Sequence, residues 1–241
     1  MNDLPLNGKT ILITGSAKRV GRLFALACAQ AGADIVIHHG HSREEALQVK
    51  DEIESIGRKA HIIASDIGKP AEAAKLISKA NQFSPLFALV NSAAIFEPLS
   101  FDDTTLEDWK RHLALNLTAP FLLSQEFARH TKKGRIVNIV DWRALRPGAD
   151  HFPYTISKAA LASLTQSMAV ALAPRITVNG LALGAILAPS GGKKSDKIIK
   201  DVPAKRWSEP QEPGEALVFL LTGPSYITGE IIHVDGGRHL I

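Results

Sequence analysis

Short runs of β-branched and other apolar residues alternate along the chain with longer segments whose apolar positions recur at helical spacing. Runs of the first kind suit strands that are buried on both faces, and segments of the second kind suit amphipathic helices. Seven strands are predicted, at residues 10–14, 34–38, 60–65, 86–91, 135–140, 176–179 and 230–234. This alternation builds repeated βαβ units and therefore predicts an α/β fold with a doubly wound parallel sheet.

Residues 185–208 interrupt the alternation, since they are rich in glycine, lysine, serine and proline and show only weak periodicity. We expect this segment to form a lid over a ligand site. In open parallel sheets, ligands bind outside the carboxyl ends of the strands, so the residues that follow each strand are the first candidates for chemistry. A chain of 241 residues with this pattern predicts one domain, residues 1–241.

Composition and charge argue against several classes of protein. Cys28 is the only cysteine, so neither a disulfide framework nor a thiolate metal site is expected. The formal net charge is +4, but the lysines and arginines are scattered and form no stripe for nucleic acid. No apolar segment is long enough to cross a bilayer, and the first residues do not resemble a secretion signal. We therefore expect a soluble cytoplasmic protein that binds a small molecule and no metal.

The residues after the first predicted strand have the composition of a phosphate-binding turn. Gly15 and Gly21 bound a short loop that leads from an apolar strand into an amphipathic helix. Glycines let the backbone approach a phosphate, and the N–H groups at a helix N-terminus favour negative charge. We expect the pyrophosphate of a dinucleotide to bind here, although an ordinary strand-to-helix turn has the same outline.

The end of the second predicted strand bears on which dinucleotide is bound. An NAD enzyme places a carboxylate there for the ribose hydroxyls, but residues 38–43 contain none. The basic and hydroxyl side chains that could bind a 2′-phosphate are Lys18, Arg19, His41, Ser42 and Arg43. NADPH is therefore favoured over NADH, unless His41 and Arg43 merely solvate a helix start. Asp66, after the third strand, is a candidate acceptor for the adenine amino group, which is compatible with a role as helix N-cap.

Tyr154 and Lys158 stand four residues apart in a predicted helix, so their side chains share one face. A nearby ammonium group lowers the pKa of a phenol, which makes tyrosine a useful acid near neutral pH. Pairs at this spacing are also common among surface neighbours, so this pair gains weight only from other features.

Asn116 lies four residues before Pro120 in a helical pattern. Because proline has no N–H, the Asn116 carbonyl cannot form its helical hydrogen bond, and a bend is predicted. Our hypothesis is that the free carbonyl holds a water that contacts Lys158 and opens a proton path to solvent. A bend that serves packing alone is the alternative.

In order and spacing, these motifs resemble the short-chain dehydrogenase/reductase family over essentially the whole chain. The matching segments are residues 14–21, residues 91–94, Asn116, Tyr154 with Lys158, residues 226–229 and residues 234–237. The resemblance implies a Rossmann-type fold, an NADPH-dependent oxidoreductase activity and a homotetramer. Leu183 precedes Gly184 where the family usually has proline, and Ser92 replaces a second asparagine, so the nicotinamide end is expected to differ in detail.

Three departures from the usual family pattern resemble the pteridine reductase branch. Arg19 stands where a second glycine is usual, Asp141 stands thirteen residues before the tyrosine where serine is usual, and Phe96 falls where that branch stacks an aromatic ring on the pterin. A carboxylic acid beside a tyrosine can relay a proton to a ring nitrogen, whereas a serine hydroxyl only polarises a carbonyl. Each departure also has a plainer interpretation, with Arg19 as a phosphate ligand only, Asp141 as a structural acceptor and Phe96 as core.

Carried over residue by residue, the resemblance implies three sets of roles. Catalysis would use Asp141, Tyr154, Lys158 and Asn116. Cofactor binding would use Gly15, Lys18, Arg19, Val20, His41, Ser42, Arg43, Asp66, Ile67, Asn91, Ala93, Tyr154, Lys158, Gly184 and Ile186. Substrate binding would use Arg19, Phe96, Asp141 and Tyr154.

Three functions follow from these features. The first is an NADPH-dependent reductase of a pterin-like heterocycle. The second is a carbonyl reductase, such as a 3-oxoacyl thioester reductase, although an acidic group beside a developing oxyanion is unfavourable unless it is protonated. The third, from another class, is a catalytically silent NADP(H)-sensing regulator, because a fold can bind a dinucleotide without chemistry. The presence of Tyr154, Lys158 and Asn116 together argues against the regulator.

Overall fold

The computed structural model describes residues 4–188 and 191–241, and within them seven parallel strands form one sheet in the order β3-β2-β1-β4-β5-β6-β7. The strands are β1 (Thr10–Ile13), β2 (Asp34–His39), β3 (Ala60–Ala64), β4 (Leu86–Asn91), β5 (Gly134–Asp141), β6 (Ile176–Leu183) and β7 (Ile231–Val234). The chain builds outward from β1 to β3, returns to the other side of β1 and continues to β7. The predicted doubly wound α/β fold in a single domain is therefore confirmed.

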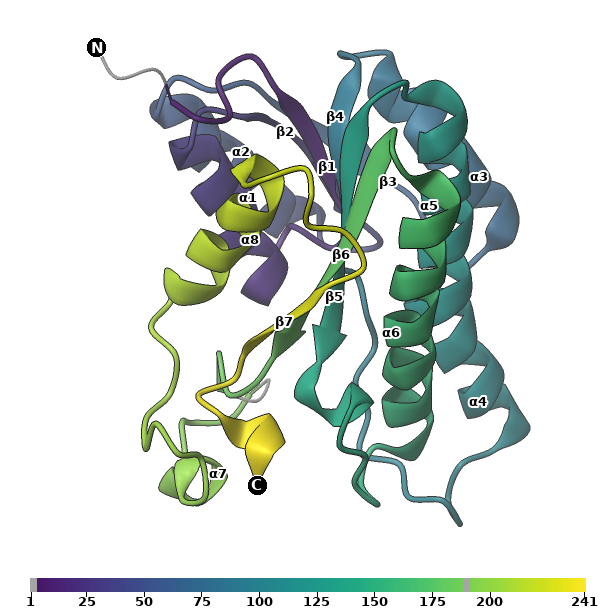
Figure 1. The fold of residues 1–241 in the computed structure, drawn as a ribbon, viewed down its shortest axis with the longest axis vertical. Helices are drawn as coiled ribbons and strands as arrows, with labels where there is room; N and C mark the ends of the chain where they lie inside the picture. The colour runs from purple at the N-terminus through teal and green to yellow at the C-terminus, as the bar shows by residue number, and fades with distance from the viewer. Residues whose placement is uncertain (1–3, 189–190) are drawn as a thin grey trace.

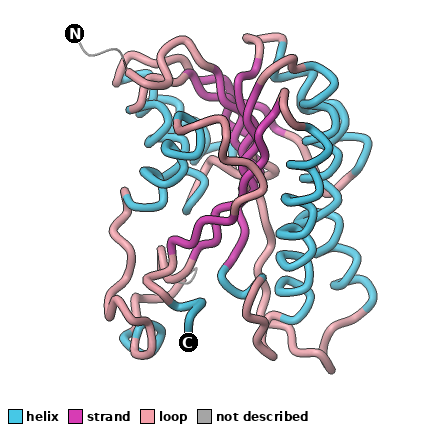
Figure 2. Tube along the Cα trace, in the orientation of Figure 1, coloured by secondary structure: helices cyan, strands magenta, loops and turns pink. Residues whose placement is uncertain are grey.

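Helices cover both faces of the sheet (Figures 1 and 2). They are α1 (Arg19–Gln30), α2 (Arg43–Ser55), α3 (Pro70–Asn81), α4 (Leu106–Leu113), α5 (Ala119–His130), α6 (Phe152–Leu172), α7 (Asp196–Ile199) and α8 (Glu212–Thr222). In Figure 1, α1, α2 and α8 lie on one side of the sheet, and α3, α4, α5 and α6 lie on the other. Along the described part of the chain, no helix combines the length and hydropathy that a bilayer crossing requires.

The strands are apolar on both faces because each face is covered by a helical layer. In β1, Ile11 and Ile13 pack with the residues of α1 and α8, whereas Leu12 packs with those of α3 and α5. Successive side chains of a strand point to opposite faces, so a strand between two covered faces has no position that favours a polar residue. This burial explains why the strands stand out in the sequence as short continuous apolar runs.

Strand β6 is longer than the sequence pattern predicts, since it continues beyond residue 179 to Leu183. Gly180, the first residue beyond the predicted range, lies within the strand and is buried. A Cβ atom on Gly180 would lie 3.1 Å from Ile231 and 3.3 Å from Val140. The glycine therefore allows β5 and β7 to pack closely on either side, as glycines within strands often do.

The segment predicted as a lid begins directly after β6 and contains α7. At its base, the Ser208 N–H donates to the Ala185 carbonyl at 3.0 Å, so the two ends of the segment lie together. Positions 189 and 190, which belong to the predicted lid, lie outside the described residues. The carboxyl ends of the strands meet the start of this segment, and the predicted site residues gather there.

Candidate active site

The loop after β1 is tight enough to require its glycines. Gly15 has a φ of +66°, and a Cβ atom on it would lie 2.9 Å from the Cα of Ala93. A Cβ atom on Gly21 would lie 2.2 Å from the Gly15 carbonyl oxygen. The first residues of α1 have no side-chain cap, so the N–H groups of this helix end are free to bind a phosphate. The loop therefore fits the pyrophosphate of a dinucleotide.

His38 holds this loop in place, and the sequence interpretation missed it. The Gly15 N–H donates to Nδ1 of His38 at 3.1 Å, and Nε2 of His38 lies 3.0 Å from the Ser65 carbonyl oxygen. With Nδ1 accepting, Nε2 carries the proton and donates to Ser65. Burial lowers the pKa of His38 to about 4, which keeps the ring neutral. A histidine inside an otherwise apolar strand was the available signal for this role.

The adenosine end of the predicted cofactor site lies between β2 and α2. His41 and Arg43 are exposed there, and Lys18 forms an exposed ion pair with Glu45 at 3.9 Å. His39, which precedes them, has a buried Nδ1 atom without a hydrogen-bond partner in the described residues. This edge of the sheet therefore offers basic groups and an unused imidazole nitrogen, without a carboxylate in residues 38–43.

The structure contradicts the interpretation of Asp66 as a helix N-cap. Helix α3 begins at Pro70, its N-cap is Lys69, and no side chain caps it. The Asp66 carboxylate instead accepts from the Gly68 N–H at 3.2 Å and lies 3.4 Å from the Lys69 ammonium. Asp66 therefore shapes the turn after β3, because a short side chain in a turn competes for nearby N–H groups.

The other predicted cofactor residues fall along the same edge. Ile67 and Ile186 are buried, and Val20 is half-buried in the first turn of α1. Asn91 ends β4, and its side-chain amide donates to Asn138 at 2.8 Å and to Ser124 at 3.2 Å. Its Oδ1 atom is buried without a partner in the described residues. These contacts bind β4 to β5 and α5 and leave one acceptor of Asn91 unused.

Gly184 and Ala93 come within close reach of backbone from other segments. A Cβ atom on Gly184 would lie 2.6 Å from the Cα of Asp235. The Ala93 N–H donates to the Thr14 hydroxyl at 3.0 Å, as does the Ser92 N–H at 2.9 Å. Thr14 was not among the predicted site residues, yet its hydroxyl joins the end of β4 to the loop after β1.

Tyr154 and Asp141 form a hydrogen-bonded pair of acids at the centre of this edge. Asp141 is the last residue of β5, and Tyr154 lies in the first turn of α6. The Tyr154 hydroxyl donates to Oδ2 of Asp141 at 3.0 Å, and Oδ1 of Asp141 accepts from the Arg143 N–H at 2.9 Å. Lys158 lies one turn further along α6, and its ammonium donates to the Ile139 carbonyl at 2.6 Å. The three residues that the sequence pattern singled out are thus brought together.

The direction of the tyrosine pKa differs from the prediction. Burial and the adjacent Asp141 carboxylate raise the pKa of Tyr154 well above its usual range. Burial also raises the pKa of Asp141, and it lowers the pKa of Lys158 to about 8. The expectation that Lys158 lowers the phenol pKa was wrong, because the Tyr154 hydroxyl bonds Asp141 whereas the Lys158 ammonium donates to the Ile139 carbonyl. Tyr154 therefore keeps its proton near neutral pH, and Asp141 keeps its proton to a higher pH than an exposed aspartate.

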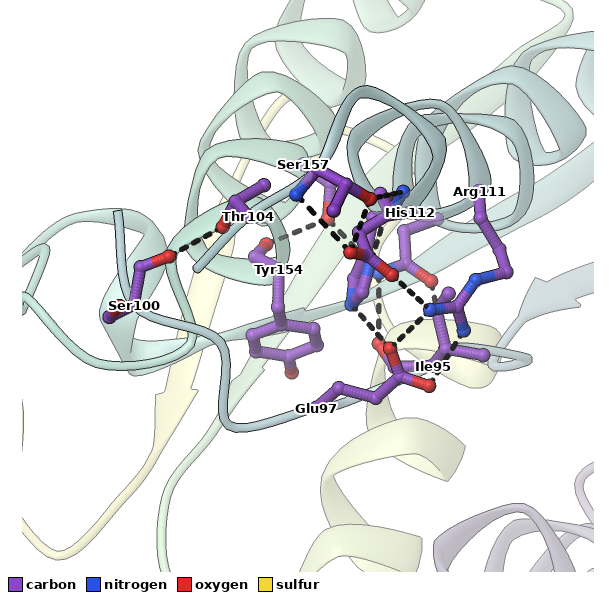
Figure 3. A network of polar contacts seen from close by, with 11 residues as sticks. Ile95, Glu97, Ser100, Thr104, Arg111, His112, Tyr154 and Ser157 are labelled. Atoms are coloured by element: carbon purple, nitrogen blue, oxygen red, sulfur yellow. Dashed lines mark hydrogen bonds and ion pairs between the residues drawn. The ribbon is translucent and has the colours of Figure 1, made fainter. Parts of the chain in front are cut away.

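Asn116 connects the loop after β4 with α6 through its hydrogen bonds to Ile95 and Ser157, two residues that are labelled in Figure 3. Its side chain is buried, accepts from the Ile95 N–H at 3.0 Å and donates to the Ile95 carbonyl and the Ser157 hydroxyl, each at 3.0 Å. Ser157 in turn donates to the Tyr154 carbonyl at 2.7 Å. The amide therefore fixes the first turn of α6, and Ser157 is a further member of the site that the sequence interpretation missed.

The helix that carries Asn116 is interrupted where Pro120 predicts a break. Between α4 and α5, residues Ala114–Thr118 form a π turn, η1. The Ala119 N–H bonds the Ala114 carbonyl, which skips the usual spacing by one residue. The predicted irregularity is confirmed, whereas the water held by the Asn116 carbonyl stays a prediction.

Phe96 lies at the surface beside Tyr154, with 53% of its area exposed. The interpretation of Phe96 as core was therefore wrong. Its ring meets the Tyr154 ring edge-on, with centroids 4.6 Å apart, and stacks on the His151 ring with centroids 3.9 Å apart and planes 8° apart. The ring of Phe96 therefore stacks with a flat heterocycle of the chain itself, His151, next to Tyr154 and Asp141.

Arg19 reaches from the phosphate-binding loop to the start of the predicted lid. Its guanidinium donates to the Ala188 carbonyl at 2.9 Å. Its backbone has a φ of +54°, which is uncommon for a residue other than glycine and is found most often at functional positions. Arg19 is thus placed between the loop and the segment that follows β6.

Known proteins share this chain's sequence and fold over nearly its whole length. A family model described as enoyl-(acyl carrier protein) reductase matches residues 15–239. The 3-oxoacyl-[acyl-carrier-protein] reductase FabG of Aggregatibacter actinomycetemcomitans is 34% identical over 238 residues, which cover 95% of this chain and 98% of that protein. The crystal structure of FolM alternative dihydrofolate reductase 1 from Brucella suis in complex with NADP has a TM-score of 0.89 and 30% identity, covering 97% of this chain and 96% of that one. A short-chain dehydrogenase from Burkholderia cenocepacia in complex with NADP has a TM-score of 0.90 and 35% identity, covering 96% and 98%.

Proposed function

The chain belongs to the short-chain dehydrogenase/reductase family and is an NADPH-dependent oxidoreductase, and from this premise we propose that it reduces a pterin-like heterocycle. When bound, NADPH supplies the hydride. The residues of this chain bind and orient the two ligands and deliver the proton.

The observation that carries the proposal is the hydrogen bond between the Tyr154 hydroxyl and the Asp141 carboxyl, 3.0 Å long. Reduction of a C=N bond leaves electron density on nitrogen, which must take up a proton. Burial raises the pKa of both Tyr154 and Asp141, so Tyr154 is suited to give this proton and Asp141 to help restore it. Phe96 supports the same substrate, because a flat ring stacked on it would lie beside both acids. The name of the Brucella suis protein also fits, since dihydrofolate contains a pterin ring.

We assign the supporting roles as follows. Lys158 and Asn116 hold the first turn of α6 and the proton path, and Arg19 lies between cofactor phosphate and substrate. The cofactor is bound by the predicted residues Gly15, Lys18, Arg19, Val20, His41, Ser42, Arg43, Asp66, Ile67, Asn91, Ala93, Tyr154, Lys158, Gly184 and Ile186. Residues 185–208 cover the substrate as a lid. From the family resemblance we further propose a homotetramer, in which exposed apolar residues such as Val170 of α6 lie at subunit contacts.

Substitution of Arg43 by alanine tests the assignment of the 2′-phosphate site. Arg43 is exposed and has no carboxylate partner in the described residues, so its charge is free to bind a phosphate. A charged hydrogen bond contributes about 1.5–3 kcal/mol, so we expect the KM for NADPH to rise about 10- to 100-fold. The KM for NADH should stay within about twofold. A variant in which the KM values for both cofactors rise equally would place Arg43 outside the phosphate site.

Carbonyl reduction is the second candidate, and the identity to a 3-oxoacyl-[acyl-carrier-protein] reductase favours it. The objection from the sequence was that a charged Asp141 repels a developing oxyanion. Burial raises the pKa of Asp141, which weakens that objection because the neutral acid does not repel the oxyanion. The sensing regulator is not retained, since the chain is an oxidoreductase.

The direct test is NADPH oxidation by the purified protein with dihydropterins and, in parallel, with a short 3-oxoacyl thioester. The absorbance of NADPH reports both reactions in the same assay. We expect turnover of the dihydropterins with kcat/KM at least about tenfold above that of the thioester. Turnover of the thioester alone would overturn the pterin proposal and return Asp141 and Phe96 to structural roles.

A further inference from the structure

Beside the two candidate acids, one cation has no anion of its own. Arg238 begins the short helix η3 (Arg238–Leu240) and is partly buried. The carbon of its guanidinium lies 4.2 Å from the ring centroid of Trp142, which directly follows Asp141 in the chain. Within residues 4–188 and 191–241, no group accepts a hydrogen bond from this guanidinium. A partly desolvated guanidinium without a carboxylate partner gains a strong, charge-assisted hydrogen bond when an anionic ligand provides the acceptor.

The carboxylates close enough to act on Arg238 electrostatically are those of Asp141, Asp150 and Asp235. Each of them makes its hydrogen bonds elsewhere. The donors to these carboxylates are the Tyr154 hydroxyl and Arg143 N–H for Asp141, the Arg143 guanidinium and His151 for Asp150, and Gly237 and His239 for Asp235. The donors of the Arg238 guanidinium are therefore not used by these carboxylates and can bind a ligand.

The guanidinium of Arg143 adds positive charge beside Arg238. Together with the rings of Phe96 and Trp142, the two arginines form one side of the candidate site, called the wall below. The Arg143 guanidinium carbon lies 4.8 Å from the Trp142 centroid and 5.9 Å from the Phe96 centroid. Arg143 is paired with Asp150 at 2.7 Å, so it is held in place while Arg238 stays free. Burial, together with the repulsion from Arg143, lowers the pKa of Arg238. An anionic group of a ligand, bound beside the guanidinium groups of Arg143 and Arg238, would relieve this repulsion.

The order of groups along the wall suggests how a substrate lies. Phe96 and Tyr154 meet edge-on, Arg143 lies over the ring of Phe96, and Arg143 and Arg238 share the ring of Trp142. A flat ring on Phe96 beside the acids would thus extend its substituent toward the guanidinium pair. The guanidinium fork binds carboxylates in two parallel hydrogen bonds, which suits an acidic tail.

We propose that Arg238, with Arg143 beside it, binds a carboxylate on the tail of the substrate, so that the preferred substrate is a pterin with an acidic side chain rather than an uncharged one. This inference rests on the proposed reduction of a pterin ring and adds the chemistry of the side chain that the ring carries. Dihydrofolate carries such carboxylates, and dihydrobiopterin presents a pterin ring without them.

The test compares kcat/KM for dihydrofolate and dihydrobiopterin in the wild type and in Arg238→Gln. We expect the substitution to lower kcat/KM for dihydrofolate about 10- to 100-fold, mainly through KM, as the loss of a charged hydrogen bond predicts. The value for dihydrobiopterin should stay within about twofold. Arg146→Gln is the matched control, because Arg146 is an exposed arginine three residues after Arg143, and the guanidinium groups recorded over the Trp142 ring are those of Arg143 and Arg238. This control substitution should leave kcat/KM unchanged for both substrates.

Ionic strength provides a measurement that does not depend on any variant. Screening weakens the attraction between a carboxylate and the guanidinium pair, so the wild-type KM for dihydrofolate should rise several-fold between about 0.05 M and 0.5 M salt. The KM for dihydrobiopterin should rise much less. A 3-oxoacyl thioester of a phosphate-bearing carrier is measured as a third substrate, because its salt dependence distinguishes binding of a phosphate from binding of a carboxylate.

The outcomes separate this inference from the proposed function. Equal losses for both pterins in Arg238→Gln, or no loss for either, would overturn the carboxylate site and leave the ring reduction standing. A salt effect limited to the phosphate-bearing thioester would assign the guanidinium pair to a phosphate and overturn it as well. Absence of turnover for both pterins in the wild type would overturn the proposed function and, with it, the present inference.

Discussion

Replacement of Tyr154 by phenylalanine is expected to lower kcat for NADPH oxidation about a thousandfold while the Kd for NADPH stays within about threefold. A positioned general acid contributes roughly 10²- to 10⁴-fold to a rate, and the Tyr154 hydroxyl is the buried donor to Asp141. Phenylalanine keeps the ring that meets Phe96 edge-on, so the shape of the site is preserved. Steady-state rates and a fluorescence titration of NADPH binding measure the two quantities separately.

Tyr226→Phe is the matched control for this substitution. Tyr226 is the second of the two tyrosines and is fully exposed. Its hydroxyl has no hydrogen bond in the described chain, so its loss should leave kcat and the midpoint of thermal unfolding unchanged. If Tyr154→Phe retained more than about a tenth of the wild-type rate, another group would have to be the acid, and Asp141 would be the first candidate.

The positions of the strands could be predicted because each strand of a parallel sheet is buried on both faces. In β1, Ile11, Leu12 and Ile13 are all fully buried, and such a run stands out without knowledge of its partners. The exception is β6, which continues past the predicted end at residue 179 and includes Gly180. Its role depends on the approach of Ile231 and Val140 from neighbouring strands, and no local pattern carries that information.

The site could be predicted as a set of positions, but not as a set of contacts. The spacing of Tyr154 and Lys158 is local, and the helix places both where the pattern expects them. The direction in which the pKa of Tyr154 is shifted was predicted wrongly, because the hydroxyl bonds Asp141, which belongs to β5. Helical spacing identifies neighbours on the same element only, whereas a buried pKa depends on every element packed around the group.

The contacts of His38 and Arg238 illustrate the same limit at greater distance along the chain. His38 bonds Gly15 across 23 positions, and Arg238 meets Trp142 only because η3 returns to the turn after β5. A histidine in an apolar strand marks His38 as unusual, but the sequence does not show which group it contacts, and Arg238 carries no local signal at all. Their roles follow from the parallel order of the sheet, which brings the carboxyl ends of distant strands to one edge.

Substitution of Asp141 by serine is expected to lower kcat/KM for dihydropterins at least about a hundredfold and to leave NADPH binding unchanged. Asp141 is the partner that accepts from Tyr154, and serine provides a shorter side chain without an acidic proton. Asp141→Asn is the second variant, since asparagine keeps the size and an acceptor oxygen for Tyr154. Rates with dihydropterins and with a 3-oxoacyl thioester are measured for both variants. Loss of thioester turnover in step with pterin turnover would show that Asp141 supports the site in general and does not select the pterin.

The pH dependence of these variants identifies the active form of Asp141. Burial raises the pKa of Asp141, so if the neutral acid is active, kcat/KM for dihydropterins is constant below that raised pKa and falls above it. Asp141→Asn removes this fall, and any fall that remains near pH 8 belongs to Lys158, whose pKa burial lowers to about 8. The same raised pKa means that Asp141 contributes stability at low pH that is lost as the pH rises through it. The free energy of unfolding of Asp141→Asn, measured with urea at pH 7, should therefore equal or exceed that of the wild type. If the pH dependence of kcat/KM in Asp141→Asn were the same as in the wild type, Asp141 would not be the titrating acid.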